Sequence, residues 1–242
     1  ESMSKSKKNV VDPDEIISAY GADTARWFML SDSPPDRDIN WSDAGVKGAW
    51  KFTQKFWRVF NESLDILRDT NLIEPKKYTE KALQLRKFTH NSLSLITNHI
   101  ESFQMNVAVA KIYEIINELN KFKASENSEK FAQKELIMIL IRISEPMMPH
   151  ITQEAWSILN NQTLLALEPW PKIEKKLLID TSTTVVIQIN GRKKGEINIT
   201  IDADEKDVFT QAMKIENISS SINQDNIKKK IYIKNKILNI VI

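Results

Sequence analysis

The hydrophobic period of this chain changes once, and that change restricts its fold more than any other feature. Through most of the chain apolar residues recur every three or four positions, as Phe52, Phe56 and Phe60 do. After residue 182 they alternate instead, as Val185 and Ile187 do. A period near 3.6 is typical of an amphipathic helix, and a period of two is typical of a strand. We therefore expect a mainly α protein, a helical bundle followed by a small α+β domain.

The start of the first helix is marked by Asp12-Pro13-Asp14-Glu15. Asp12 can cap free backbone N–H groups, and Pro13 suits the first helical turn. Gly21 is predicted to close this helix in a left-handed conformation. Further helices are predicted at 22–30, about 43–69 after a Ser42 cap, 79–102, 107–123 after an Asn106 cap, 128–144 and 150–160.

The predicted helix 43–69 carries an aromatic band that includes Trp50, Phe56 and Trp57. Such a band can serve as a stacking platform for bases, or it can pack as a seam of the core. The helical spacing of its members favours the core. The segment 136–151 is apolar on nearly all sides, which predicts a buried helix.

The segment 167–180, "LEPWPKIEKKLLID", carries two prolines and has no clear period. It is predicted to be a linker or a strap across the bundle. We expect four regions: a lysine-rich N-terminal loop with connecting helices at 1–41, a helical bundle at 42–165, a linker at 166–182 and a small α+β domain at 183–242.

The net charge of +2 means that any nucleic-acid binding must come from local patches. Residues 183–242 contain ten basic and seven acidic residues, a larger excess than that of the whole chain. The basic residues concentrate next to Asn190-Gly191, which predicts a tight hairpin turn, and again near residue 229. The candidates for nucleic-acid contact in these two clusters are Arg192, Lys193, Lys194, Lys228, Lys229 and Lys230, and solvated surface side chains are the alternative interpretation.

Several site classes are disfavoured by composition. The chain has no cysteine, which excludes disulfides and cysteine-ligated metal sites. His90, His99 and His150 are too far apart in sequence to form a histidine pair on adjacent helical turns, so no metal site is expected. No apolar run is long enough to predict a membrane span, and no Gly-rich phosphate loop is present.

The string "MSKSKKNVVDPDEIISAYGADTARWFML" resembles the signature loop and following helices of class I aminoacyl-tRNA synthetases. Two further stretches, "YGADTARWFMLSDSPPDRDINW" and "VVIQINGRKKGEI", are similar to the leucyl-tRNA synthetase family within that class. A valine or isoleucine type is the alternative, although the isoleucine type usually ends in a zinc module. Because the chain begins with Glu1 at the edge of the signature, we interpret it as the C-terminal part of a longer enzyme.

The resemblance implies that leucine is activated with ATP and Mg²⁺ and transferred to tRNA(Leu). It assigns Lys5 as the catalytic lysine, which would stabilise negative charge on the phosphates in the transition state. Met3, Ser4, Lys5 and Ser6 would form the ATP-binding loop. Ser2 stands where the family signature has its first lysine, which removes one positive charge.

The resemblance also implies that the small C-terminal domain contacts tRNA. Arg192 and Lys194 match basic positions of the family hairpin, with lysine in place of arginine at the second. A lysine there lacks the bidentate fork that arginine offers to phosphate. Solvated lysines on a hairpin are the alternative interpretation.

The family's nucleotide-binding fold and editing domain are not found in this sequence, so ATP and leucine would bind through parts outside it. We therefore expect the chain alone to be inactive and to hold no cofactor. A cytoplasmic, monomeric protein is expected. The alternatives are a stand-alone, non-catalytic tRNA-binding module and a generic helical interaction protein.

Overall fold

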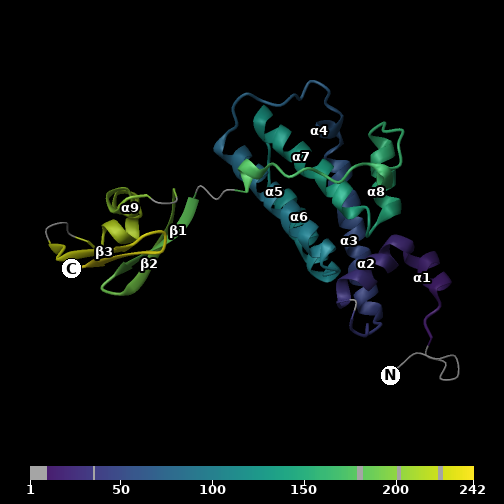
Figure 1. Cartoon of the computed structure of the whole chain (residues 1–242), viewed down its shortest axis with the longest axis horizontal. Coiled ribbons are helices and arrows are strands. Elements are labelled where there is room, and N and C mark those ends of the chain that lie inside the picture. The colour runs from purple at the N-terminus through teal and green to yellow at the C-terminus, as the bar shows by residue number, and fades with distance from the viewer. Residues whose placement is uncertain (1–9, 35, 179–181, 201–202, 223–225) are drawn as a thin grey trace. The chain divides into compact units, whose positions relative to one another are not determined.

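The computed structural model describes residues 10–34, 36–178, 182–200, 203–222 and 226–242 (Figure 1). The chain divides into two compact units, with the division between residues 178 and 179. The described part of the first unit is helical, and the described part of the second contains a four-stranded sheet. The predicted fold class is confirmed at this level. No helix in the described residues is both long and apolar enough to cross a membrane.

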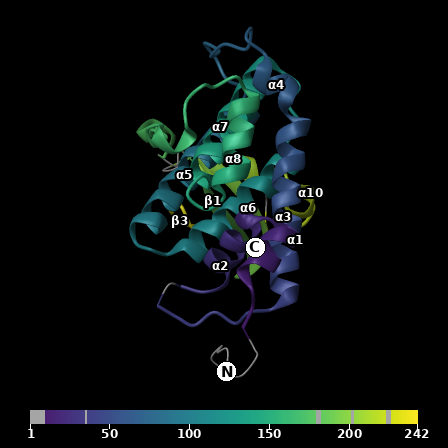
Figure 2. The same cartoon turned by 90° about the vertical axis from the view of Figure 1, so that its right-hand side faces the viewer.

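The helices of the first unit follow the predicted order. They are α1 (Pro13–Tyr20), α2 (Ala22–Asp32), α3 (Asp43–Glu62), α4 (Leu64–Arg68), α5 (Glu80–Glu101), α6 (Met105–Lys121), α7 (Asn127–Ser144) and α8 (Pro149–Ile158), followed by the short 3₁₀ turns η2 (Leu165–Leu167) and η3 (Lys175–Leu177). Helix α8 lies against α7 and α3 (Figure 1, Figure 2).

Two local predictions for this unit were wrong, and a third was right only in part. The single helix expected at 43–69 is broken at Ser63, whose hydroxyl donates to the Val59 carbonyl and whose backbone N–H bonds the Phe60 carbonyl three residues back. These bonds tighten the chain and separate α3 from α4. Asn106 is not a cap, because α6 begins at Met105. Gly21 closes α1 with a positive φ of 84°, as predicted, but its ψ of 153° lies outside the left-handed helical region.

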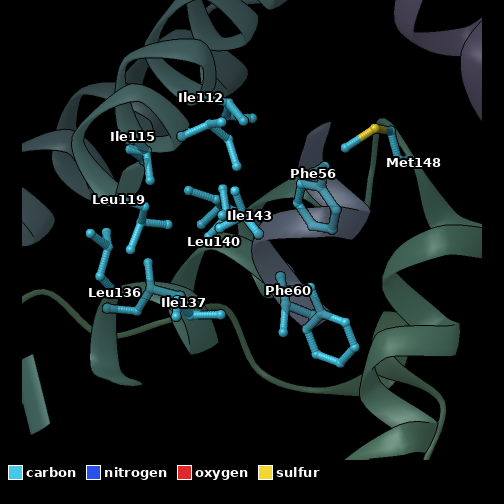
Figure 3. Packing of buried hydrophobic residues seen from close by; sticks show 14 of the residues in the cluster. Phe56, Phe60, Ile112, Ile115, Leu119, Leu136, Ile137, Leu140, Ile143 and Met148 are labelled. Carbon is cyan, nitrogen blue, oxygen red and sulfur yellow. The ribbon is translucent and has the colours of Figure 1, made fainter. Parts of the chain in front are cut away.

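The core of the helical unit is built from aromatic and branched aliphatic side chains. Phe52, Phe56 and Phe60 of α3 are each 2% exposed, which confirms that the aromatic band is a core seam. Trp50 lies at the edge of the band and is 36% exposed. Figure 3 shows part of this core, with labelled side chains Phe56, Phe60, Ile112, Ile115, Leu119, Leu136, Ile137, Leu140, Ile143 and Met148.

The second unit is a mixed sheet covered on one face by helices. Its elements are β1 (Ser182–Ile189), β2 (Arg192–Thr200), α9 (Glu205–Ala212), the short α10 (Glu216–Ser219), β3 (Lys229–Ile233) and β4 (Ile237–Val241). The strand order is β2-β1-β4-β3, with β1 parallel to β4 and the other pairs antiparallel. Alternate residues of the central strands, such as Ile187 and Leu238, are buried with Val208 of α9.

The predicted hairpin turn is confirmed. Asn190 and Gly191 have φ values of 47° and 79°, and Ile189 lies opposite Arg192. Positive φ at both central residues matches the right-handed twist of the two strands, which is why Asn-Gly suits this turn. The turn thus places Arg192 at the first position of β2.

Candidate nucleic-acid interface

The predicted ATP-side loop, with Met3, Ser4, Lys5 and Ser6, lies outside the described residues, as does Ser2. Its catalytic and ATP-binding roles therefore stay predictions. The described structure begins just after this loop. There Asp12 caps α1, and its Oδ1 accepts a hydrogen bond from the backbone N–H of Asp14 at 2.9 Å.

The helix that follows the signature is fixed to the rest of the helical unit by polar contacts. Asp23 of α2 is buried and accepts from the backbone N–H groups of His150 and Ile151 at 3.3 and 2.7 Å. It therefore caps the free N-terminus of α8 from a different helix. Arg26 donates to the Pro146 carbonyl at 2.8 Å. Asp23 and Arg26 belong to the stretch that resembles the class I synthetases. This stretch thus connects α2 to α8 by hydrogen bonds.

The same string also contributes to the core. Trp27 is fully buried and stacks on Phe52, with ring centroids 4.3 Å apart and planes 3° from parallel. Its indole N–H donates to the Tyr113 hydroxyl at 3.3 Å. Stacked aromatic pairs contribute beyond their buried area. Helix α2 is therefore held to α3 and α6 by packing as well as to α8 by hydrogen bonds.

The segment after α8 packs on the helical unit as a strap. Leu165 and Leu177 are buried, and the Trp170 indole N–H donates to the Thr97 hydroxyl at 2.9 Å. Arg142 donates to the Pro169 carbonyl. The sequence predicted either a linker or a strap across the bundle. These contacts favour the strap for the described residues up to 178.

An ion network anchors the strap to α5 and α7. Arg86, whose side chain is 3% exposed, binds both oxygens of Glu135 at 2.7 and 2.9 Å and also reaches Glu174 of the strap. The backbone N–H of Glu174 donates to His90 Nδ1 at 3.2 Å. That nitrogen is therefore unprotonated, and the ring N–H on Nε2 donates to Glu135 at 3.3 Å.

The network determines the protonation of its carboxylates. Burial by itself raises the pKa of Glu135, but hydrogen bonds from Arg86 and His90 and the charge of Arg86 outweigh burial and lower the pKa to about 2. Burial also opposes the ionised form of Glu174, and its contacts with Lys176 and Arg86 lower its pKa in the same way. Both carboxylates are thus ionised at neutral pH.

His90, Glu135 and Glu174 bring possible metal ligands within 4.8 Å of one another. Arg86 already occupies both oxygens of Glu135, and its fixed positive charge opposes a cation at this point. Both nitrogens of His90 are engaged as well. The donor set therefore fits an ion network better than a metal site.

The sheet unit brings together the six basic residues predicted to bind RNA. Arg192 of β2 lies opposite Ile189 of β1. Ile189 lies beside Ile240 of β4, which lies opposite Lys230 of β3. Arg192 and Lys230 therefore occupy one row across the sheet, with Cα atoms roughly 14 Å apart for three strand spacings. We call this row and its neighbours, residues 192–194 and 228–230, the basic end.

Most side chains of the basic end are free of carboxylates. Within the described residues, five of the six have no acidic partner, namely Arg192, Lys194, Lys228, Lys229 and Lys230. Lys193 pairs with exposed Glu196 in the same strand. Lys230 lies over the Phe209 ring, with Nζ 3.5 Å from the centroid.

Lys194 occupies an irregular position in its strand. Ile187 pairs with Gly195 and Gln188 pairs with Lys193, so Lys194 has no residue opposite it. Such a bulge bends the strand and redirects a side chain. It separates Lys194 from the regular alternation of β2, and the side chain is exposed.

Two protein families match parts of this chain. The family described as "Anticodon-binding domain of tRNA ligase" matches residues 83–235, and the family "tRNA synthetases class I (I, L, M and V)" matches residues 1–42. Leucine–tRNA ligase of Parvibaculum lavamentivorans is 43% identical over 242 residues, and that of Agrobacterium fabrum is 42% identical over 249. The alignments cover all of this chain and 28% of each relative.

Solved structures show the same fold. The ternary complex LeuRS-tRNA-LeuAMS of Agrobacterium radiobacter K84 matches with a TM-score of 0.76 and 28% identity, over 99% of this chain and 31% of that one. Methionyl-tRNA synthetase of Mycobacterium tuberculosis bound to methionyl-adenylate shares the fold over 65% of this chain and 35% of its own, with a TM-score of 0.53 and 22% identity. The predicted resemblance to leucyl-tRNA synthetases is confirmed, and the chain belongs to the family of anticodon-binding domains of tRNA ligases.

Proposed function

We propose that this chain is the C-terminal part of a leucine–tRNA ligase and that it docks tRNA(Leu) on that enzyme. The observation that carries the proposal is the match of the whole chain to leucine–tRNA ligases at up to 43% identity. The complete enzyme would activate leucine with Mg²⁺-bound ATP and transfer it to tRNA. The signature lysine and the tRNA-docking surfaces would come from this chain, and the amino-acid pocket from the remainder.

The basic end of the sheet unit is the proposed contact for the tRNA backbone. Structured RNA is recognised largely by shape and by phosphate and 2′-hydroxyl contacts. Exposed lysine and arginine side chains without carboxylate partners suit phosphate positioning rather than base readout. Arg192 and Lys194 are both exposed and unpaired within the described residues, so their charge is available to phosphate.

The test is the salt dependence of tRNA(Leu) binding to the chain. The double variant Arg192→Ala/Lys194→Ala is expected to bind more weakly and to lower the slope of log K against log salt by about two charges' worth. The matched control Lys206→Ala/Lys236→Ala removes the same charge from α9 and from the β3–β4 turn. Equal slopes for the two double variants would contradict direct phosphate contact at the basic end.

Lys5 is proposed to stabilise the negative charge that develops on the phosphates during leucine activation. In the complete enzyme, Lys5→Ala is expected to abolish leucine-dependent ATP–pyrophosphate exchange and to leave tRNA binding intact. Normal exchange in that variant would remove the catalytic assignment. The chain alone is expected to show no exchange, since the amino-acid pocket lies in the remainder. We also propose that the enzyme is monomeric and cytoplasmic, as the family resemblance implies.

A further inference from the structure

Phe103 is placed where backbone geometry favours glycine. It follows the Ser102 cap of α5 and has φ 56°. Its N–H bonds the Ile100 carbonyl at 3.0 Å, and the next N–H, of Gln104, bonds the His99 carbonyl at 2.7 Å. This pair of bonds closes the helix as a Schellman motif, whose left-handed position is usually glycine.

A phenylalanine at this position is unfavourable in two ways. In the left-handed region Cβ comes close to the following carbonyl oxygen, which costs free energy for any residue but glycine. The other described non-glycine residues with positive φ are Asn160, Asn190 and Asn235, and asparagine tolerates this region well. Phe103 is also 71% exposed, so its ring gains little from packing. Strain without a packing gain is typical of functional positions.

The ring stands beside a hollow of about 520 Å³ between the α5–α6 connection and the turn after α2. This volume is within the range of about 300–1,000 Å³ common for ligand sites. Besides Phe103, the hollow is lined by Pro34 and Val107 and by five polar residues, namely Asp36, Arg37, Ser102, Gln104 and Asn106. They offer a guanidinium, two amides, a hydroxyl and a carboxylate.

A second hollow in the helical unit provides a comparison. It measures about 420 Å³ and is lined only by apolar side chains around α1 and α2, among them Ile17 and Met29. Apolar lining of that kind suits an apolar protein surface. An exposed aromatic ring edged by donors and acceptors suits an unpaired nucleobase instead, which offers a π-face for stacking and polar edges for hydrogen bonds.

We propose that Phe103 is a stacking platform for an unpaired nucleotide of the bound tRNA, with Arg37 as the cation for its phosphate. Asp36 and the amide of Asn106 would pair with the edge of the base. Gln104 would offer only its amide nitrogen, because its Oε1 is already hydrogen-bonded to His99 Nδ1 at 2.7 Å. This inference rests on the proposed tRNA-docking function. It assigns the stacking role that the sequence left open for the aromatic band of α3 to a different residue, outside the core.

The test compares folding with tRNA(Leu) binding in the same variants. Phe103→Asn is expected to unfold at the same or a higher temperature, because asparagine tolerates the left-handed backbone. Its tRNA affinity is expected to fall roughly 5- to 100-fold, the range for losing one base–aromatic stack, with an unchanged salt slope. Phe103→Trp is expected to retain the affinity, since indole also stacks. Leu167→Asn, a control at a side chain 79% exposed, is expected to leave affinity unchanged.

Several outcomes would overturn the inference. It fails if Phe103→Asn keeps its affinity, or if the variant unfolds at a clearly lower temperature, which would make the ring structural. A change in self-association without a change in tRNA affinity would assign the hollow to a protein contact. Arg192→Ala/Lys194→Ala in the same titration separates the proposal of tRNA docking from that of base stacking on Phe103. If only that variant loses affinity, the first is supported and the second is contradicted.

Discussion

The two units of this chain use charged side chains in opposite ways. In the helical unit Arg86 is 3% exposed and is held by two carboxylates. In the sheet unit Arg192 is exposed and has no acidic partner in the described residues. A buried, paired charge fixes the position of a segment, here the strap, whereas an exposed, unpaired charge remains available for a ligand. Substitutions in the two units should therefore change different measurements.

The largest expected effect is that of Arg86→Met. It leaves Glu135 without its cation and Glu174 with Lys176 alone, and breaking such a buried network costs about 3–5 kcal/mol of unfolding free energy. All six tryptophans lie between residues 27 and 170, so their fluorescence in denaturant reports on the helical unit alone. The control is Arg58→Met, which removes an exposed pair with Glu62 and is expected to cost at most about 0.5 kcal/mol. Similar losses of unfolding free energy in Arg86→Met and Arg58→Met would contradict the difference between buried and exposed charges.

A smaller effect is expected for Asp23→Ala. This change removes the acceptor that caps α8, and lost caps cost about 1–2 kcal/mol. Asp23→Asn keeps one acceptor oxygen and is expected to lose less. Tryptophan fluorescence in denaturant measures both. If the alanine variant is as stable as the native chain, the joint between α2 and α8 depends on packing alone.

The buried ion network should also make the unfolding free energy of the helical unit depend on pH. The pKa of Glu135 is lowered from 4.5 to about 2 in the folded chain, so its contribution to stability is present above about pH 4.5 and is lost as the pH falls toward 2. The difference in unfolding free energy between the native chain and Glu135→Gln should therefore shrink over that interval. Denaturant titrations at a series of pH values test this, and a constant difference would contradict it.

The acid sensitivity that remains in Glu135→Gln has an identified source. The backbone N–H of Ser125 is the main cause that lowers the pKa of Glu129 to about 2, with help from the Ser125 hydroxyl and Lys81 and against the effect of burial. Glu174 contributes in the same direction. The variant should therefore still lose stability in acid, with a lower slope than the native chain.

The smallest expected effect belongs to the sheet unit. Glu196→Gln removes the exposed partner of Lys193 and should change stability by less than about 0.5 kcal/mol. The freed lysine and the lost negative charge should raise tRNA affinity slightly, by about twofold or less. Circular dichroism in denaturant and a tRNA titration measure the two quantities. A loss of affinity would mean that Glu196 itself contacts the RNA.

Local patterns predicted the elements well because helices, caps and tight turns depend on a few consecutive residues. Asp12 caps α1, Ser42 caps α3 and Asn190-Gly191 makes the hairpin turn, all as expected. The failures were local too. At Ser63 the backbone N–H bonds the Phe60 carbonyl three residues back, and this tighter turn interrupts a helix that the spacing of the neighbouring residues favours.

The candidate sites depended on contacts between distant segments. Sequence alone identified the two basic clusters that contain Arg192 and Lys230, but only the parallel pairing of β1 with β4 places them in one row. It gave no sign that Asp23 caps a helix 127 positions away. The position of Phe103 was not predicted, because a phenylalanine between two helices gives no sequence signal for a left-handed backbone.

The sequence by itself determined the periods, the turns, the local charge and the family resemblance, since each is a property of neighbouring residues. The tertiary structure decided which charges are paired and which are free. Pairing depends on burial and on distances between segments far apart in the chain, as in the contact of Arg86 with Glu174. That difference separates the residues that hold the strap from those available to RNA.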